Sequence, residues 1–382
     1  MELDNKNQYS NQTKPAYYFY RRPVLKFLFK TIDSFGFLNF RLSSKIKKTS
    51  GKILIINLGG AGDLIISEPL LSALASFSEN KVDLICFPGQ EKALIGLACL
   101  GKIYNLELPW IGGRKKIVQS LIDLFNLKRI LKKEKYPVVV DIKGDPLIIL
   151  LMFFSKIPAR VGFSNGGLGF LLTHPISTPE NLKRFKVDLV LGESFEGDKF
   201  KNFARDPLLL LPGDSNKLKE LRESSLKKII TVHLGASCQA RCWPLENWAA
   251  LLSELVAKYN IVIVGSPKDL LLSKSLDQKI YSLCTDLSGQ PWLETAKAIA
   301  ESDLFIGANS GPAHLAAALN CPVINIFSAA NDAEVWAPPK AEVLIFKPEC
   351  AGCELNYCDH LSCLKAITPQ MVKGAVLEIL ET

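Results

Sequence analysis

The sequence lacks any apolar run long enough to cross a membrane as a helix. Such a helix needs about 20 apolar residues, and the longest run here, PLIILLMFF at 146–154, has nine. No secretory signal is visible at the N-terminus, where polar residues give way to mixed basic and aromatic ones. These absences argue against a helical integral membrane protein and lead us to expect a cytoplasmic one.

Two nucleotide-binding signatures are also missing. The sequence contains neither G-x-G-x-x-G nor G-x-x-x-x-G-K-[ST], which weakens the interpretation as a dehydrogenase or a P-loop NTPase. It shows no short tandem repeat and no nucleic-acid-binding module, so we expect no nucleic-acid partner. With 382 residues, 48% hydrophobic and 22% charged, the chain has the composition of a globular protein of two domains.

Net charge is absent from most of the chain and concentrated at its start. Residues 1–52 hold eleven Lys and Arg against three Asp and Glu, whereas the remainder holds 35 of each sign. Within residues 15–48, apolar Leu25, Leu28, Phe29 and Ile32 recur at helical spacing. A basic, aromatic, amphipathic helix is typical of a membrane-surface anchor. The alternative is a helix packed on the body of the protein with a solvated basic side.

From residue 52 onward, strand signals alternate with helix signals in two series. A polar stretch at 211–228 separates the series, and each predicts a parallel, doubly wound sheet. We therefore expect an N-terminal segment at 1–50 and two Rossmann-like domains at 51–207 and 214–382. The strands expected in the first are 52–58, 82–87, 106–109, 138–142 and 160–163, and in the second 229–235, 259–265, 303–307 and 323–327.

Ligands of such sheets bind where strands end and helices begin, and the turn NSGPAH (309–314) fits that position. Backbone N–H groups near Ser310 and Gly311, together with the helix dipole, would make a seat for phosphate or another anion. His314 follows in the first helical turn. Simple N-capping by Ser310, with His314 a core residue, is the structural alternative.

Two further loops contain unusual residues. In GASCQARCWPLENW (235–248), Arg241 precedes a helix and could hold a diphosphate, although a surface arginine beside a structural Trp-Pro start fits equally. In GGAGD (59–63), Gly59, Gly60 and Gly62 would admit a ligand near the backbone. Asp63 then serves either as a general base in the cleft or as a helix cap.

Taken together, these loops resemble glycosyltransferase family 9, the heptosyltransferases of lipopolysaccharide core assembly. The resemblance covers about residues 52–380 and also includes DIKGD (141–145) and RVGFSNGGLGFLLTHPI (160–176). It implies the GT-B architecture, in which two Rossmann-like domains face each other across a cleft. The first domain would bind the acceptor and the second the nucleotide sugar.

The resemblance also implies roles for single residues. Asp63 matches the catalytic base, Arg241 a diphosphate ligand, and Ser310 with Gly311 the phosphate-binding turn. Asp269, in VGSPKD, falls near the acidic residue that holds the ribose, and His314 lies beside the donor. The implied reaction is an inverting transfer of heptose from ADP-heptose to a lipopolysaccharide core acceptor, with no cofactor required, at the inner face of the cytoplasmic membrane.

One residue departs from the family pattern. Many members have Asp where this chain has Asn309, which keeps hydrogen bonding but loses the charge. Two alternatives therefore remain open. The chain could be a GT-B transferase that uses another nucleotide sugar, or a non-catalytic protein that binds a nucleotide sugar or glycolipid.

The cysteines offer a possible structural metal site. Four of the ten lie in CAGCELNYCDHLSC, at Cys350, Cys353, Cys358 and Cys363. A C-x2-C pair followed by two further cysteines fits a tetrahedral zinc site, with His360 as an alternative ligand. Free thiols and, less readily in a reducing compartment, disulfides are the alternatives.

Overall fold

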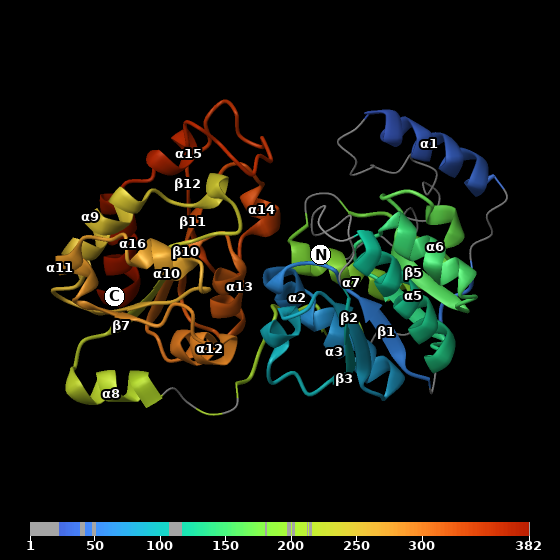
Figure 1. The fold of residues 1–382 in the computed structure, drawn as a ribbon, viewed down its shortest axis with the longest axis horizontal. Coiled ribbons are helices and arrows are strands. Elements are labelled where there is room, and N and C mark those ends of the chain that lie inside the picture. The colour runs from blue at the N-terminus through green and yellow to red at the C-terminus, as the bar shows by residue number, and fades with distance from the viewer. Residues whose placement is uncertain are drawn as a thin grey trace, which may run out of the picture.

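The computed structural model describes residues 23–38, 43–47, 51–106, 117–179, 182–196, 200, 203–211, 213 and 216–381. It contains two parallel six-stranded sheets, and Figure 1 shows them as two halves lying side by side. The strands of the first sheet lie within 53–176 and those of the second within 229–345. In the described part of the chain, no helix combines the length and apolar character needed to cross a membrane.

Both sheets follow one topology. The strand order is β3-β2-β1-β4-β5-β6 in the first and β9-β8-β7-β10-β11-β12 in the second. This is the doubly wound order, in which the chain adds strands on one side of its first strand and then crosses back to add strands on the other side. The reversal point of each sheet is the place between the first strand and the first strand added on the other side, β1 and β4 or β7 and β10. The strands are β1 Ile53–Ile56, β2 Val82–Cys86, β3 Leu100–Asn105, β4 Val138–Asp141, β5 Ala159–Phe163, β6 His174–Ile176, β7 Ile229–His233, β8 Asn260–Ile263, β9 Cys284–Asp286, β10 Leu304–Ala308, β11 Val323–Phe327 and β12 Glu342–Ile345.

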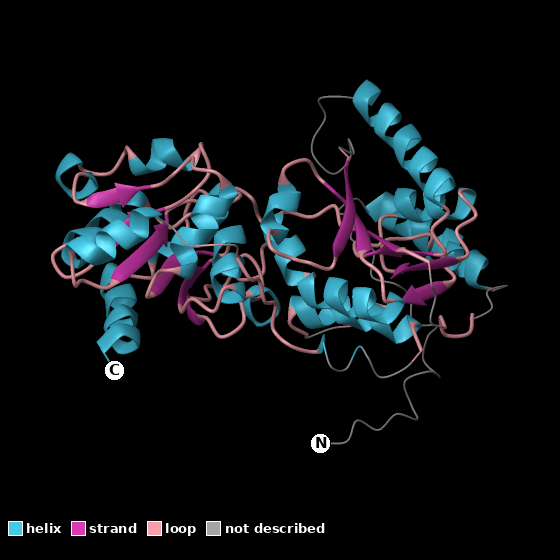
Figure 2. Cartoon of the chain, turned by 90° about the horizontal axis from the view of Figure 1, so that it is seen from below, coloured by secondary structure: helices cyan, strands magenta, loops and turns pink. Residues whose placement is uncertain are grey.

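Helices cover both faces of each sheet, as Figure 2 shows from a second direction. For this reason β1, β4, β7 and β10 are buried along their whole length and consist mainly of apolar residues. The α-helices are α1 Pro23–Phe37, α2 Ala61–Ile66, α3 Glu68–Ser78, α5 Ile117–Glu134, α6 Pro146–Phe154, α7 Arg184–Val190, α8 Asn216–Ser224, α9 Leu245–Leu255, α10 Asp269–Ser273, α11 Gln278–Tyr281, α12 Trp292–Ala300, α13 Gly311–Ala318, α14 Ala333–Trp336, α15 Ser362–Lys365 and α16 Pro369–Glu381. Short 3-10 helices are η1 Gln90–Leu94, η2 Gly169–Leu171, η3 Leu191–Ser194 and η5 Gln239–Arg241.

Two details differ from the sequence-based expectation. Of the strand expected at 106–109, Leu106 lies in a loop and 107–109 fall outside the described residues; the described strand in this region is β3, just before them. The helical run expected at 64–77 is divided into α2 and α3 around Ser67. Pro69 accounts for the division, because it has no N–H to continue the hydrogen-bond ladder of α2.

Candidate active site

The reversal points of the two sheets face one cleft. In each sheet, residues that follow the two central strands line this cleft: Asp63 and Lys143 after β1 and β4, and Ala236 and Asn309 after β7 and β10. Strand pairing aligns those ends, with Ile56 opposite Asp141 in the first sheet and His233 opposite Gly307 in the second. The cleft has a volume of about 890 Å³ and is lined by residues of both halves. It therefore occupies the place where doubly wound sheets bind ligands.

Asp63 lies in the first turn of α2 and makes two different contacts with its carboxylate oxygens. Oδ2 accepts a hydrogen bond from the Gly60 N–H at 2.9 Å, as in a helix cap. Oδ1 accepts one from Lys143 Nζ at 2.6 Å. Gly59 makes the arrangement possible, because a Cβ there would lie 2.5 Å from the Cβ of Asp63. Capping and a position in the cleft are thus combined in one side chain.

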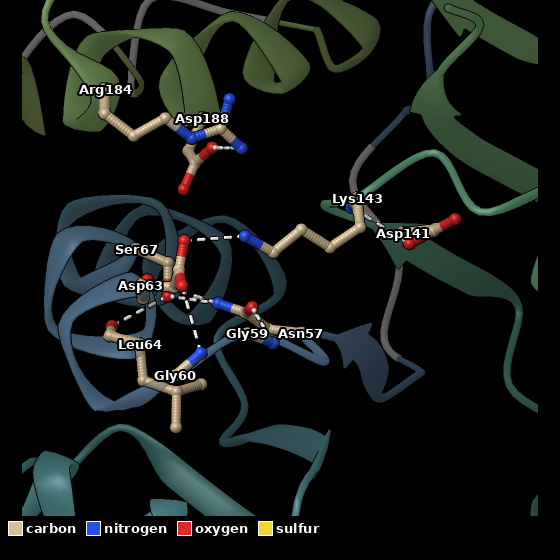
Figure 3. A network of polar contacts seen from close by, with 10 residues as sticks. All are labelled: Asn57, Gly59, Gly60, Asp63, Leu64, Ser67, Asp141, Lys143, Arg184 and Asp188. Carbon is tan, nitrogen blue, oxygen red and sulfur yellow. Dashed lines mark hydrogen bonds and ion pairs between the residues drawn. The ribbon is translucent and has the colours of Figure 1, made fainter. Parts of the chain in front are cut away.

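Lys143 holds Asp63 in its ionised form. Burial alone would raise the pKa of Asp63, but the charge of Lys143 and its hydrogen bond outweigh burial, and the pKa lies below its ordinary value of 3.8. Lys143 follows β4, and its N–H donates to the buried carboxylate of Asp141 at 3.0 Å, which fixes the loop. Figure 3 shows Lys143 reaching from the end of β4 to Asp63.

A second ion pair lies beside the first and contacts the other half of the molecule. Arg184, on α7, pairs with the buried Asp188 at 3.0 Å. Burial raises the pKa of Asp188 to about 6, although the positive charges of Arg184 and Lys143 oppose that rise. The Arg184 guanidinium also lies 5.8 Å from the ring centroid of Trp336, on α14. Arg184 therefore contacts Asp188 of the first half and Trp336, which lines the cleft from the second half.

Arg241 lies at the end of η5 and lines the cleft. Its Nε atom is buried and has no hydrogen-bond partner in the structure, so it is a donor without an acceptor. The Cys-rich segment holds this loop: the Ala240 N–H donates to Asn356 O at 3.1 Å, and the Gln239 side chain exchanges two hydrogen bonds with the backbone of Cys358. The C-terminal segment thus positions the arginine.

The turn NSGPAH meets the glycine loop directly. Ser310 is the N-cap of α13, and the start of that helix packs against the start of α2. A Cβ on Gly311 would lie 3.4 Å from the Cβ of Ala61, and one on Gly62 would lie 3.5 Å from the Cα of Gly311. The starts of the two helices are thus in van der Waals contact, and a Cβ on Gly62 would also lie 3.1 Å from Cδ2 of His314. Their combined positive ends favour an anion in the cleft.

His314 is buried under this contact. Its ring packs against Gly62, and its Nδ1 atom has no hydrogen-bond partner in the structure. Burial lowers the pKa of His314 to about 4, and the nearby Asp63 only partly offsets the effect. The imidazole is therefore neutral at physiological pH.

The burial of His314 predicts that the free energy of unfolding depends on pH. The unfolded chain takes up a proton at His314 near pH 6.5, whereas the folded chain does so only near pH 4. Folding stability from this group is therefore complete above pH 6.5 and is lost progressively as the pH falls from about 6.5 to about 4, by roughly 2 to 3 kcal/mol at pH 4.5. Urea unfolding at pH 7.5 and 4.5 should show that His314→Gln loses about this much less stability on acidification than the wild type. Equal losses would contradict the assignment.

A second histidine, His233, lies in the same part of the cleft. His233, at the end of β7, lies 3.2 Å from Ser310 Oγ through Nδ1 and 3.5 Å from Asp269 Oδ2 through Nε2. Asp269 Oδ2 also accepts hydrogen bonds from the N–H and Oγ of Ser266, both at 2.7 Å. Burial would raise the pKa of Asp269, but these contacts outweigh it and lower the pKa to about 2. Asn309, at the end of β10, is buried and lines the same wall.

Most residues singled out in the sequence thus meet in one place. The cleft is lined by Gly60, Gly62, Asp63, Arg241, Asp269, Asn309, Ser310, Gly311 and His314. Gly59 does not line it and acts instead by making room for Asp63. Sequence reasoning assigned no role to Lys143 or His233. Their positions at the ends of strands beside the reversal points were the available signal.

The four cysteines do not form a ligand set. Cys350 and Cys353 are exposed, whereas Cys358 and Cys363 are buried, and all ten cysteines are free. Cys358 Sγ accepts a hydrogen bond from the Leu361 N–H at 3.4 Å. Among the described residues, no three His, Cys, Asp or Glu side chains gather as they would around a metal. The structure thus gives the zinc prediction no support.

Two Rossmann-like halves meet at one cleft, which is lined by Asp63 of the first half and by Arg241 and the turn at 309–314 of the second. This combination defines a two-domain glycosyltransferase of GT-B architecture. The chain belongs to glycosyltransferase family 9 (heptosyltransferase), whose sequence model matches residues 124–358. The resemblance noted in the sequence is thereby confirmed.

Individual relatives agree with this assignment. Lipopolysaccharide heptosyltransferase 1 of Campylobacter coli is 27% identical over 312 residues, covering 73% of this chain and 84% of the relative. The solved structure of Escherichia coli ADP-heptose lipopolysaccharide heptosyltransferase II superposes with a TM-score of 0.66 at 20% identity, covering 86% of this chain and 98% of that one. A family 9 glycosyltransferase from Veillonella parvula gives 0.70 at 16% identity, covering 89% and 100%.

Proposed function

We propose that this protein transfers a heptose from ADP-heptose to a lipopolysaccharide core acceptor with inversion at the anomeric carbon. One observation carries the proposal: the ionised Asp63 of the first half shares a cleft with Arg241 and the Ser310–Gly311 turn of the second. A base and a diphosphate seat on opposite walls are what a direct displacement requires. The acceptor hydroxyl enters from one side and the nucleoside diphosphate leaves on the other.

In the proposed reaction, the acceptor oxygen attacks the anomeric carbon while Asp63 Oδ1 takes its proton. The bond from that carbon to the diphosphate oxygen breaks through an oxocarbenium-like state, as in glycoside hydrolysis. Lys143 keeps Asp63 ionised before the acceptor binds and remains within hydrogen-bonding distance of it. General-base catalysis of this kind contributes about 10²- to 10⁴-fold to the rate.

The second half would stabilise the charge that grows on the departing diphosphate. The unpaired Nε of Arg241 and the N-terminus of α13 are positive groups already fixed in the cleft wall. Preorganised groups of this kind lower the barrier because they need no rearrangement as charge develops. Asp269 is proposed to lie near the ribose, and Asn309 near the donor sugar.

The identity of the substrates is inferred from the relatives. The solved E. coli structure is named for ADP-heptose, and the C. coli relative for lipopolysaccharide heptose transfer. A thermal-shift panel of ADP, UDP, GDP and CMP tests the donor. We expect ADP to stabilise the protein most. Preference for UDP or GDP would move the donor to another sugar nucleotide, and no response to any nucleotide would contradict the proposed function.

We further propose that the enzyme works in the cytoplasm, attached to the inner face of the membrane through residues 15–48. Within this segment the structure describes α1 and a short stretch beyond it. Phe27, Phe35 and Leu38 are 73%, 69% and 76% exposed, and the basic Lys30 is also exposed. Phe37 packs against Phe170 of η2 at 6.3 Å and ties the helix to the first half. Exposed aromatic and basic side chains together favour an anionic lipid surface over simple packing on the body.

Vesicle flotation tests the membrane proposal. In the full chain, Phe27→Ser combined with Phe35→Ser should weaken binding to vesicles containing anionic lipid by about tenfold or more, because two apolar side chains no longer insert. The matched control is Phe346→Ser, since Phe346 is also exposed but lies in the second half. Unchanged binding of the double variant would refute the role of α1.

A further inference from the structure

We propose that Asp269, His233 and Ser310 form a relay that sets the direction of the Ser310 hydroxyl and couples binding of the donor diphosphate to proton uptake at His233. The inference rests on the proposed function, because it concerns the same donor site. In it His233 is a positioning residue, which acts on the ligand through Ser310.

The imidazole of His233 lies between the side chains of Asp269 and Ser310. Asp269 meets Nε2 of the imidazole at 3.5 Å, and Nδ1 on the other side meets Ser310 Oγ at 3.2 Å. Ser310 occupies the N-cap position of α13, yet its hydroxyl makes no capping hydrogen bond to the helix. An N-cap serine ordinarily accepts from the N–H groups of the first turn. Here the hydroxyl is committed to His233, on the cleft side of the turn.

The surroundings are built to hold this arrangement. His233 is 5% exposed, and the Asp269 carboxylate is fixed by both donors of Ser266. The backbone makes room for it at Gly235, where a Cβ would lie only 2.0 Å from Asp269 Oδ1. At Gly265 a Cβ would lie 2.6 Å from the Cβ of Asp269. Glycine is thus required next to Asp269 in the loops after both β7 and β8. An ion pair at the open surface would not need this room.

The protonation state of His233 decides what Ser310 offers a ligand. In the neutral ring with a proton on Nε2, that proton bonds to Asp269, and Nδ1 accepts the hydroxyl proton of Ser310. Ser310 then presents only lone pairs to the cleft, which repel a phosphate oxygen. In the imidazolium, Nδ1–H donates to Ser310 Oγ, and the hydroxyl proton is free for the diphosphate.

Binding of a diphosphate therefore favours the imidazolium, with the additional proton taken from solvent. Of the titratable groups on this part of the cleft wall, Asp269 alone has an ion pair or hydrogen bond with His233 in the described structure. The other titratable residues that line the cleft are Asp63, Lys92, Lys143, Arg241, Lys268 and His314.

Calorimetric titration with ADP, in buffers of different ionisation heat, measures this proton directly. On binding ADP we expect the wild type to take up more protons than His233→Gln, and its ADP affinity to fall more steeply as the pH rises, by up to about tenfold per pH unit. The titration of the ADP phosphate is common to both proteins and cancels in the comparison. Ser310→Ala should also lose the steep pH dependence and bind ADP about tenfold or more weakly.

Adenosine, which lacks the diphosphate, distinguishes the relay from a purely structural role of His233. A structural role would change the affinities for ADP and adenosine together. The relay predicts that His233→Gln weakens ADP binding but leaves adenosine affinity and the melting temperature close to those of the wild type. Equal pH dependence of ADP binding in wild type and His233→Gln would overturn the relay alone. Failure of the wild type to bind any nucleoside diphosphate would overturn the proposed function together with it.

Discussion

Replacing Asp63 with Asn is expected to lower kcat about 10²- to 10⁴-fold while leaving ADP affinity unchanged. Asn has nearly the same shape and keeps one acceptor oxygen, which can serve the Gly60 N–H and so preserve the cap of α2, whereas its NH2 group cannot accept from Lys143. It cannot take the acceptor proton, which is the property the reaction needs. Steady-state kinetics with saturating donor and acceptor, together with an ADP titration, measure both quantities.

A surface carboxylate provides the control for this substitution. Asp359→Asn removes an equal charge from an exposed position in the C-terminal segment and should leave kcat unchanged. Lys143 holds the pKa of Asp63 below 3.8, so the wild type should show no acidic limb from this residue above that pH. Full activity of Asp63→Asn would remove Asp63 as the base and leave the donor site unaffected.

The second large effect is expected at Arg241. Truncation to Ala removes a positive group that is fixed beside the proposed diphosphate, and loss of one such group typically costs about 10²- to 10³-fold in rate. Arg241→Ala should therefore lower kcat by this amount and abolish the selective thermal stabilisation by ADP. Arg241→Lys should recover part of kcat and part of the stabilisation by ADP, because Lys keeps the charge but lacks the planar guanidinium that binds bidentately.

Exposed Arg129, on α5 of the first half, serves as the matched control. Arg129→Ala removes the same side chain far from the donor wall and should affect neither quantity. If Arg241→Ala retained wild-type kcat and ADP stabilisation, the diphosphate would have to sit elsewhere in the cleft, and the assignment of the two walls would need to be revised.

The central strands were predictable because burial on both faces leaves a clear pattern. β1, β4, β7 and β10 are apolar runs with glycine or polar turns after them, and all four were expected close to their observed bounds. The edge strands β3, β6, β9 and β12 are short or partly exposed, so their sequences mix polar and apolar residues without a strict period. Periodicity could not distinguish them from loops.

The site residues divide in the same way. Asp63, Arg241 and the turn at 309–314 belong to local strand-loop-helix motifs, which can be recognised in the sequence. Lys143 meets Asp63 from 80 residues away, and His233 meets Ser310 from 77, so neither contact leaves a trace in local sequence. Both follow only once the strand order is known, because that order places the ends of β1 and β4, and of β7 and β10, side by side.

The Cys-rich segment shows the limit of motif reading. Its spacing fits a zinc site, whereas the contacts of Gln239 and Ala240 with 356–358 show a segment that supports the Arg241 loop through backbone hydrogen bonds. Spacing along the chain shows only which residues could meet. In the structure Cys350 and Cys353 are exposed, whereas Cys358 and Cys363 are buried. These hydrogen bonds give the segment a structural role at the Arg241 loop.

The most direct test of the central claim is ADP release from ADP-heptose, measured with and without a lipopolysaccharide core acceptor. The account predicts release that requires the acceptor, with a product one heptose heavier and of inverted anomeric configuration. A protein that binds ADP-heptose and acceptor but releases no ADP would be a binding protein rather than a transferase, and that result would contradict the account.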